Sequence, residues 1–128
     1  LKLSEPKVVE ENMTIYRPWG TYQVLSETKN FKVKRIVVKP NAKLSLQMHK
    51  YRSEHWVVVS GTATIINNSN EKYTLKINES TYIPKEQKHR LINETDSDLI
   101  IIEVQCGEYV GEDDILRFDD FYGRGINE

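Results

Sequence analysis

Apolar and polar residues follow one another in short runs along most of this chain. From residue 21 onward these runs are separated by turn-forming residues, which favours strands over helices. The pattern predicts strands over residues 21–25, 31–38, 44–48, 55–60, 62–67, 72–77, 80–83, 89–93 and 99–105. It predicts turns at residues 39–41, 60–61, 67–70, 78–79 and 84–87.

The spacing of these strands predicts an all-β fold. Short strands that recur about every 8 to 12 residues, without helical crossovers for a parallel sheet, are typical of an antiparallel sandwich or barrel. We expect a closed or nearly closed barrel with short irregular extensions at both ends. The last segment, residues 108–128, is rich in acidic and aromatic residues and arginine, and we expect a small helix near residues 113–118.

Length and charge restrict what this barrel can do. The 128 residues suffice for one domain, which we place at residues 16–128 after a linker or extension of residues 1–15. A formal net charge of −1 favours neither nucleic acid nor an anionic membrane as a partner. No apolar run approaches the roughly 18 residues of a membrane span. The single Cys106 excludes an internal disulfide framework, and we expect a cytoplasmic protein.

Four residues of metal-ligating type fall where strands could bring them together. Period-two alternation puts Gln47 and His49 on one face of a strand, and Glu54 opens the next strand. His89 begins another strand that could lie beside them. An amide oxygen, two imidazoles and a carboxylate suit zinc, and manganese, cobalt, nickel or iron can take the same ligands. The absence of a thiolate favours a catalytic site over a structural one.

A histidine in a strand is more often a hydrogen-bonding core or surface residue than a ligand, so the pattern alone leaves this alternative open. His55 is a useful comparison, because its parity is opposite to that of Glu54. We therefore expect His55 to face away from the metal site.

Two segments resemble the sequence motifs of the cupin superfamily. Residues 41–61 resemble the first motif, and residues 84–93, which run from a proline through His89 to an asparagine, resemble the second. Asn41 and Glu86 stand where these motifs have glycine, and Gln47 stands where the first motif has its first histidine. The resemblance implies a double-stranded β-helix, or jelly-roll, barrel whose metal site comprises the four residues named above.

A closer resemblance extends from residue 16 to residue 124. The segments that carry it are residues 17–22, 31–36, 44–49, 54–63 and 111–115, together with Arg117, Asp120 and residues 122–124. They are similar to type II mannose-6-phosphate isomerases, in which a Gln-x-His pair replaces His-x-His. The resemblance implies a metal-dependent isomerase that interconverts mannose 6-phosphate and fructose 6-phosphate through a cis-enediol. It also implies a role in GDP-mannose supply for polysaccharide biosynthesis.

In that family the domain often follows a mannose-1-phosphate guanylyltransferase in the same polypeptide. The resemblance therefore implies a covalent nucleotidyltransferase partner on the N-terminal side. No glycine-rich nucleotide-binding segment occurs here, so we do not expect this chain by itself to transfer GMP. We also expect a homodimer, because the strand edges of such barrels need cover.

The residues that transfer the proton and bind the phosphate stay open at this point. Groups of suitable pKa for proton transfer are Glu112, Asp113, Asp114 and His55. Candidates for binding the sugar phosphate are Arg17, Arg90 and Arg124, whose guanidinium groups can bind phosphate bidentately, with Lys85, Lys88 and Ser45 as further candidates. Each of these charged residues could instead form a surface salt bridge.

Two other functions fit the same barrel. One is a non-catalytic cupin that binds sugar phosphates or mediates oligomerisation for an attached transferase. The other is a different cupin chemistry, such as that of an oxygenase or a sugar-nucleotide epimerase. Oxygenases usually hold iron with two or three histidines, so Gln47 argues against that class.

Overall fold

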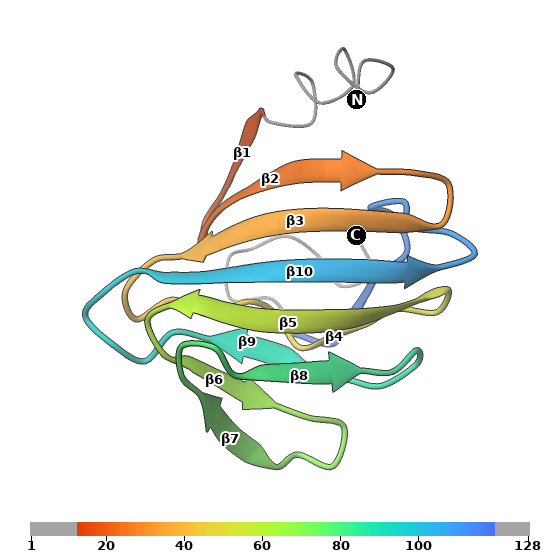
Figure 1. Ribbon diagram of the computed structural model, residues 1–128. Helices are drawn as coiled ribbons and strands as arrows, with labels where there is room; N and C mark the ends of the chain where they lie inside the picture. The colour runs from red at the N-terminus through yellow and green to blue at the C-terminus, as the bar shows by residue number, and fades with distance from the viewer. Residues whose placement is uncertain (1–12, 120–128) are drawn as a thin grey trace.

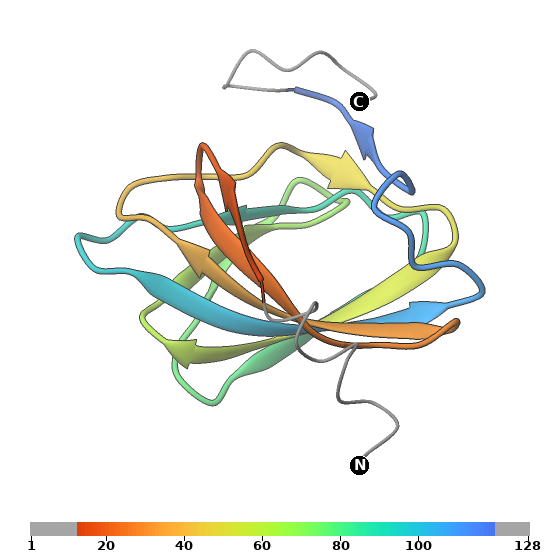
Figure 2. The same cartoon turned by 90° about the horizontal axis from the view of Figure 1, so that it is seen from above.

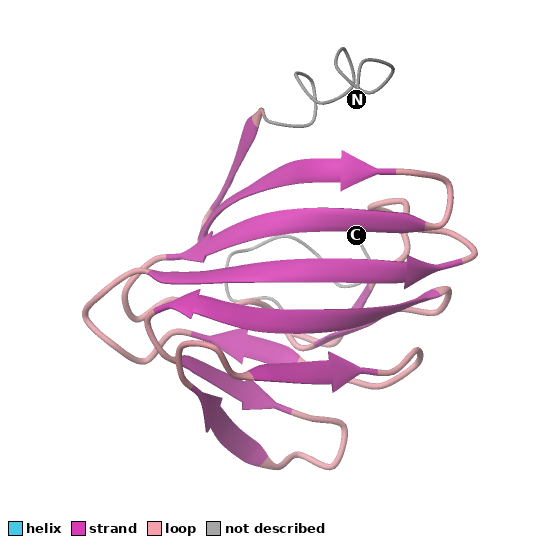
Figure 3. Cartoon of the chain, in the orientation of Figure 1, coloured by secondary structure: helices cyan, strands magenta, loops and turns pink. Residues whose placement is uncertain are grey.

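The computed structural model describes residues 13–119, and within this range the chain forms β-strands joined by turns and loops (Figures 1 and 3). In chain order the strands are β1 (Thr14–Arg17), β2 (Gly20–Glu27), β3 (Phe31–Val38), β4 (Gln47–Met48), β5 (Arg52–Ser60), β6 (Ala63–Ile66), β7 (Lys72–Leu75), β8 (Ser80–Ile83), β9 (Arg90–Ile92), β10 (Leu99–Gly107) and β11 (Leu116–Arg117). No helix that could cross a membrane occurs among these described residues.

Two layers of antiparallel strands form the barrel. The larger layer is a six-stranded sheet with the order β1-β2-β3-β10-β5-β8, and the smaller contains the sheet β7-β6-β9. Isolated bridges from Lys43 to Ile92 and from Gln47 to His89 join β9 to the segment that contains β4, and β4 pairs with β11. Seen from above, the two layers curve around a common interior (Figure 2). The predicted all-β jelly-roll barrel is confirmed.

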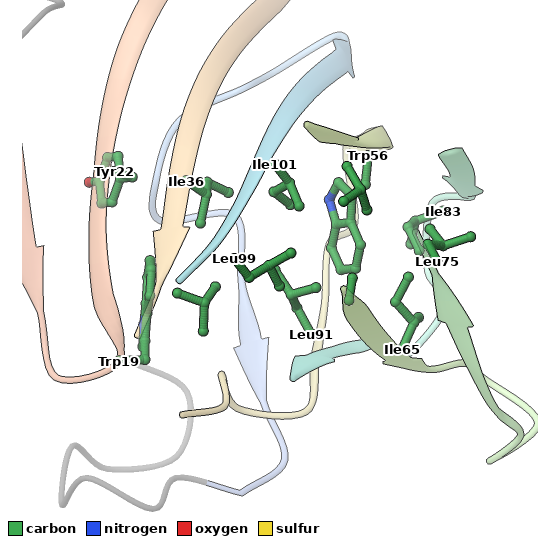
Figure 4. Packing of buried hydrophobic residues seen from close by; sticks show 13 residues of the cluster. Trp19, Tyr22, Ile36, Trp56, Ile65, Leu75, Ile83, Leu91, Leu99 and Ile101 are labelled. Carbon is green, nitrogen blue, oxygen red and sulfur yellow. The ribbon is translucent and has the colours of Figure 1, made fainter. Parts of the chain in front are cut away.

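The interior of this barrel has an apolar half and a polar half. Strands β3, β5 and β10 lie side by side, and alternate side chains of each are buried. Toward one end these inward residues are apolar and pack in the main core, which includes Ile36, Val38, Trp56, Val58, Leu99 and Ile101 (Figure 4). Toward the other end they are Lys32, Lys34, Arg52, Glu54, Glu103 and Gln105, all buried. The same strands therefore supply both the core and a buried polar chamber.

Two residues that replace motif glycines keep the backbone conformation of glycine. Asn41 and Glu86 have φ angles of 60° and 61°, in the left-handed region that glycine adopts most easily. The motif glycine that is retained, Gly61, has a φ of 88°, and a Cβ there would lie 2.7 Å from the carbonyl oxygen of Asp98. The turns of the two motifs are thus preserved in shape although two of their glycines are not.

The structure corrects several expected elements. The helix expected near residues 113–118 is wrong: this segment forms a turn followed by β11. The Asp114 carboxylate accepts hydrogen bonds from the backbone N–H groups of Lys50 and Tyr51, which ties the segment to the barrel rather than to itself. Strands β1 and β11 were not expected, and of residues 44–48 only Gln47–Met48 forms a strand.

Asn93, the last residue of the second motif, provides a test of how the barrel is held together. Its buried amide nitrogen lies 2.7 to 3.1 Å from the carbonyl oxygens of Val38, Lys39 and Ser97. We expect Asn93→Ala to lower the free energy of unfolding by about 2 to 4 kcal/mol, because these carbonyl groups lose their donor. Urea unfolding measures the change. Asn30→Ala, which removes an exposed amide bonded to Gly107, is the control; an equal loss in both variants would contradict this role.

Candidate metal centre

Three of the four predicted ligands meet in the polar half of the barrel. His49 follows β4, Glu54 faces inward from β5, and His89 directly precedes β9. The Nε2 atom of His49 lies 3.2 Å from Oε2 of Glu54, and Nε2 of His89 lies 3.6 Å from Oε1 of the same carboxylate. One donor atom from each residue lies within 4.8 Å of the others, and all three side chains are buried. These residues come from three separate strand ends.

Hydrogen bonds to backbone carbonyls orient both imidazole rings. Nδ1 of His49 lies 2.7 Å from the carbonyl oxygen of Asp114, and Nδ1 of His89 lies 3.0 Å from that of Gln87. Because a carbonyl oxygen only accepts, each Nδ1 carries the hydrogen of its bond, and Nε2 is the ring nitrogen that each histidine turns toward Glu54. Nε2 of His89 is buried and makes no hydrogen bond to a described residue. Such an orphaned nitrogen fits a metal ligand.

The protonation states of these residues also suit a cation. Burial, followed by the positive charges of Arg52 and His89, lowers the pKa of His49 to about 3, so its imidazole is neutral. Burial alone would raise the pKa of Glu54, but the nearby Arg52 guanidinium, whose Nε lies 2.9 Å from Oε2, acts together with His89 and Glu103 to lower it. A neutral imidazole and an ionised carboxylate are the forms that bind a divalent metal. The donor set therefore fits one.

Gln47 lies beside this cluster. It pairs through its backbone with His89, and its side chain lines the same cleft as Glu54. Its amide nitrogen donates to Oγ of the buried Ser45 at 3.3 Å, so the amide oxygen is the atom that it can offer to a cation. Ser45 itself is not among the residues that line the cleft.

The cleft opens from the polar half of the barrel and has a volume of about 720 Å³. The residues that line it are Tyr16, Arg17, Pro18, Trp19, Tyr22, Lys34, Ile36, Leu44, Gln47, Arg52, Glu54, Glu103, Glu112, Asp113, Ile115 and Arg117. Apolar side chains and several charged groups of both signs thus converge beside the cluster of His49, Glu54 and His89. This combination is typical of a site for a small polar ligand.

The chain matches a protein-family model described as "Mannose-6-phosphate isomerase C-terminal" over residues 4–120. It belongs to this family. It is 56% identical over 110 residues to the xanthan biosynthesis protein XanB of Xanthomonas campestris pv. campestris, covering 86% of this chain and 23% of XanB. It is 54% identical over 115 residues to the alginate biosynthesis protein AlgA of Pseudomonas syringae pv. tomato, and the match covers 90% of this chain and 24% of AlgA.

A mannose-1-phosphate guanylyltransferase of Salmonella muenchen is 44% identical over 123 residues, which cover 96% of this chain and 26% of the transferase. The chain thus spans about a quarter of the length of these curated relatives. Among solved structures, the capsular polysaccharide assembling protein CapF of Staphylococcus aureus has a TM-score of 0.73 at 20% identity, covering 84% of this chain and 31% of CapF. KdgF of Halomonas sp. has a TM-score of 0.69 at 15% identity, and the match covers 77% of this chain and 90% of KdgF. These two likenesses support the fold.

Two of the four residues expected to transfer a proton, Glu112 and Asp113, line the cleft. Glu112 lines the cleft and forms ion pairs with Lys32 and Lys34 at 2.7 and 2.8 Å. Burial alone would raise its pKa, but the two lysines outweigh burial and lower the pKa to about 2. Asp113 also lines the cleft and accepts a hydrogen bond from the Tyr109 hydroxyl.

The other two candidates do not present a carboxylate or imidazole to the cleft. The carboxylate of Asp114 is bound by the backbone N–H groups of Lys50 and Tyr51 at 2.9 Å, so this residue positions the loop and, through its carbonyl, His49. His55 is exposed on the outer face of β5, where its ring packs against Tyr82 at 4.7 Å between centroids. Its outward parity is as expected, and its place on the outer face sets it apart from the cleft; a catalytic role for His55 stays a prediction.

Of the residues expected to bind phosphate, Arg17 lines the cleft at its rim, with its guanidinium over the Tyr22 ring. Arg90 contacts Asp119, Lys88 lies over the Phe118 ring, and Lys85 is exposed in the turn before β9. These three residues are not among those that line the cleft. Arg124 lies outside the described residues.

Sequence reasoning missed four charged residues of the polar chamber: Lys32, Lys34, Arg52 and Glu103. Glu103 accepts hydrogen bonds from Nε1 of Trp56 at 2.9 Å and from Nε2 of Gln105 at 2.7 Å. Burial, followed by the negative charge of Glu54, raises its pKa. A signal was available, because these four residues share the parity of buried apolar residues on their strands, where a charge is unusual.

Metal content provides the direct test of the ligand cluster. We expect His49→Ala and His89→Ala each to weaken zinc binding about 100-fold or more, since losing even an outer partner of a ligand costs 10- to 100-fold. Zinc titration against a competing chelator, with metal analysis of the purified chain, measures this. His55→Ala is the matched control and should bind zinc as the unaltered chain does. Unchanged zinc affinity in the His49 variant would reject the site.

Proposed function

We propose that this chain is a metal-dependent mannose-6-phosphate isomerase domain that interconverts mannose 6-phosphate and fructose 6-phosphate. Its proposed ligands for one divalent cation, with zinc as the first choice, are Gln47, His49, Glu54 and His89. The observation that carries the proposal is the buried cluster of two imidazoles and one carboxylate beside a cleft, in a chain of this family. The interconversion moves a proton between C1 and C2 of the sugar through a cis-enediol.

The proposed cation has a limited part in this chemistry. When bound, a divalent metal polarises neighbouring oxygens of the sugar as a Lewis acid. The chain supplies its ligands in fixed orientations: the Asp114 and Gln87 carbonyls hold the two imidazoles, and Arg52 holds the Glu54 carboxylate. Arg52 also donates to the carbonyl oxygen of Gly111 at 3.3 Å. The ligands are therefore fixed before any substrate arrives, which is the arrangement that efficient catalysis requires.

Glu103 is our proposal for the proton-transfer group. Its carboxyl lines the cleft next to Glu54, and Nε1 of Trp56 donates to both, at 2.9 Å to Glu103 and 3.2 Å to Glu54. Its raised pKa gives it a higher proton affinity than an ordinary carboxylate has, which suits a general base near neutral pH. Glu112, with a pKa of about 2, is a weaker base. Asp113 on the rim is the alternative.

The lengths and names of the relatives suggest the wider context. The chain spans about a quarter of proteins named for xanthan and alginate biosynthesis and for mannose-1-phosphate guanylyltransferase. We therefore propose that it works in GDP-mannose supply for polysaccharide synthesis, with a nucleotidyltransferase domain on its N-terminal side in the full protein. A homodimer also stays a prediction, which light scattering of the purified chain would test.

Turnover after metal removal tests the proposed reaction. We expect the metal-stripped chain to be inactive and zinc, manganese or cobalt to restore conversion of mannose 6-phosphate to fructose 6-phosphate. A coupled assay of fructose 6-phosphate measures the rate, and circular dichroism confirms that the stripped chain is folded. A folded, metal-loaded chain that converts no sugar phosphate would contradict the proposal and favour a non-catalytic binding module.

The role of Glu103 makes a separate prediction. Glu103→Gln keeps the shape of the side chain and removes its basicity, so we expect kcat to fall about 100- to 10,000-fold while zinc content stays unchanged. Asp113→Asn is the matched variant at the rim and should reduce kcat far less. If Asp113→Asn abolishes turnover and Glu103→Gln does not, Asp113 is the base and our assignment is wrong.

A further inference from the structure

Two buried lysines lie on β3, and one of them, Lys34, lines the cleft. Lys32 and Lys34 have 3% and 6% of their surface exposed, although lysine is rarely buried unless it is paired. Both ammonium groups bind one carboxylate: Oε2 of Glu112 lies 2.7 Å from Lys32, and Oε1 lies 2.8 Å from Lys34. Lys34 also lies over the Tyr22 ring at 4.1 Å, and Lys32 lies 3.8 Å from Oε2 of Glu27. The lysines thus form a preformed anion site.

The carboxylate that fills this site comes from a different part of the chain. Glu112 belongs to the segment of residues 108–119, which we call the closing segment, and its side chain is 49% exposed. It lines the cleft beside Asp113. A half-exposed glutamate can leave its two partners more easily than the partners, which are fixed in the barrel wall, can leave their strand.

We propose that Lys32 and Lys34 bind the phosphate group of the sugar phosphate, and that Glu112 is the counter-ion that this phosphate displaces. The inference rests on the proposed function for the identity of the sugar and deepens it by assigning the phosphate site. A phosphate monoester carries about −1.5 to −2 charges at pH 7 and three acceptor oxygens, more than one carboxylate offers. Two ammonium groups that already bridge the two oxygens of Glu112 can bridge two phosphate oxygens in the same way.

The register of the sheet places this site at a suitable distance from the metal ligands. Lys32 on β3 is paired with Gln105 on β10, and Gln105 is paired with Glu54 on β5. Two strand spacings of about 4.8 Å each put Lys32 and Glu54 about 10 Å apart along the sheet. An open-chain six-carbon sugar phosphate has a similar length. Its phosphate could therefore lie at Lys32 and Lys34 while C1 and C2 lie beside Glu54.

The cleft is also lined by other cations: Arg52, which is paired with Glu54, and Arg17 and Arg117. The sequence-based candidates Lys85, Lys88 and Arg90 are not among its lining residues. Arg17 lies at the rim and can add charge to the same anion. The lysine pair is buried on a strand, with Lys34 lining the cleft, which distinguishes it from surface lysines that bind anions weakly.

Calorimetric titration of the metal-stripped chain with inorganic phosphate tests the site without the metal or turnover. We expect Lys34→Met to raise the Kd for phosphate about 10- to 100-fold, the effect of losing one charged hydrogen bond. Glu112→Gln should lower the Kd several-fold, because the competing carboxylate is removed. A purely structural ion pair would not tighten phosphate binding when Glu112 is neutralised.

The exposed pair of Lys72 and Glu94, 2.9 Å apart, supplies matched controls, and Lys72→Met and Glu94→Gln should leave the Kd unchanged.

The double variant Lys34→Met with Glu112→Gln removes both charges together and covers the case in which a single variant fails to fold. It should bind phosphate more weakly than Glu112→Gln, because it lacks one of the two ammonium groups. Unchanged phosphate affinity in Lys34→Met, equal affinity in the double variant and Glu112→Gln, or no tightening in Glu112→Gln, overturns the site even if the chain is an active isomerase. If the variants shift phosphate binding as expected and the chain isomerises nothing, the anion site stands and the proposed function fails.

Discussion

The buried carboxylate of Glu54 is the constraint on which the rest of the site depends. Taking a carboxylate out of water costs several kcal/mol unless a cation and hydrogen bonds compensate it. Arg52 supplies one such partner from the same strand, at 2.9 Å, and the Nε2 atoms of His49 and His89 face the two carboxylate oxygens. Glu103 adds a second buried carboxyl nearby, and the negative charge of Glu54 helps to raise its pKa. The two carboxyl groups, together with the imidazoles of His49 and His89, therefore place several oxygen and nitrogen donors in one buried space.

The closing segment, which is mostly turn and loop, also contacts the residues of this chamber. The Asp114 carbonyl fixes the His49 ring, and the Asp114 carboxylate accepts hydrogen bonds from the backbone of Lys50 and Tyr51, which directly follow His49. Farther along, the side chain of Asp119 accepts a hydrogen bond from the backbone N–H of Leu46 at 2.9 Å, and Phe118 donates to the Leu46 carbonyl at 2.8 Å. The orientation of His49, a proposed ligand, therefore depends on residues about 65 positions later in the chain.

Much of the fold, and the meeting of His49 and Glu54 inside the barrel, could be predicted from the sequence, because both follow from side-chain alternation. Parity placed Glu54 inside and His55 outside, as the structure has them. The motif resemblance brought in His89, and the family was confirmed. Parity also places Lys32, Lys34 and Glu103 on the buried face of their strands. It does not reveal which partners compensate their charges, because those partners come from other parts of the chain. The contacts of Asp114 could not be predicted, because irregular backbone has no periodicity from which to infer direction.

The central claim is that His49, Glu54 and His89 bind one metal in the polar half of the barrel. Anomalous diffraction from crystals of the zinc-loaded chain, collected on either side of the zinc absorption edge, tests it most directly. We expect one strong zinc peak in contact with Nε2 of both histidines and with the Glu54 carboxylate, and with the Gln47 amide oxygen beside it. Zinc bound elsewhere, with these side chains hydrogen-bonded only to one another and to Arg52, would show that these residues are not the metal site.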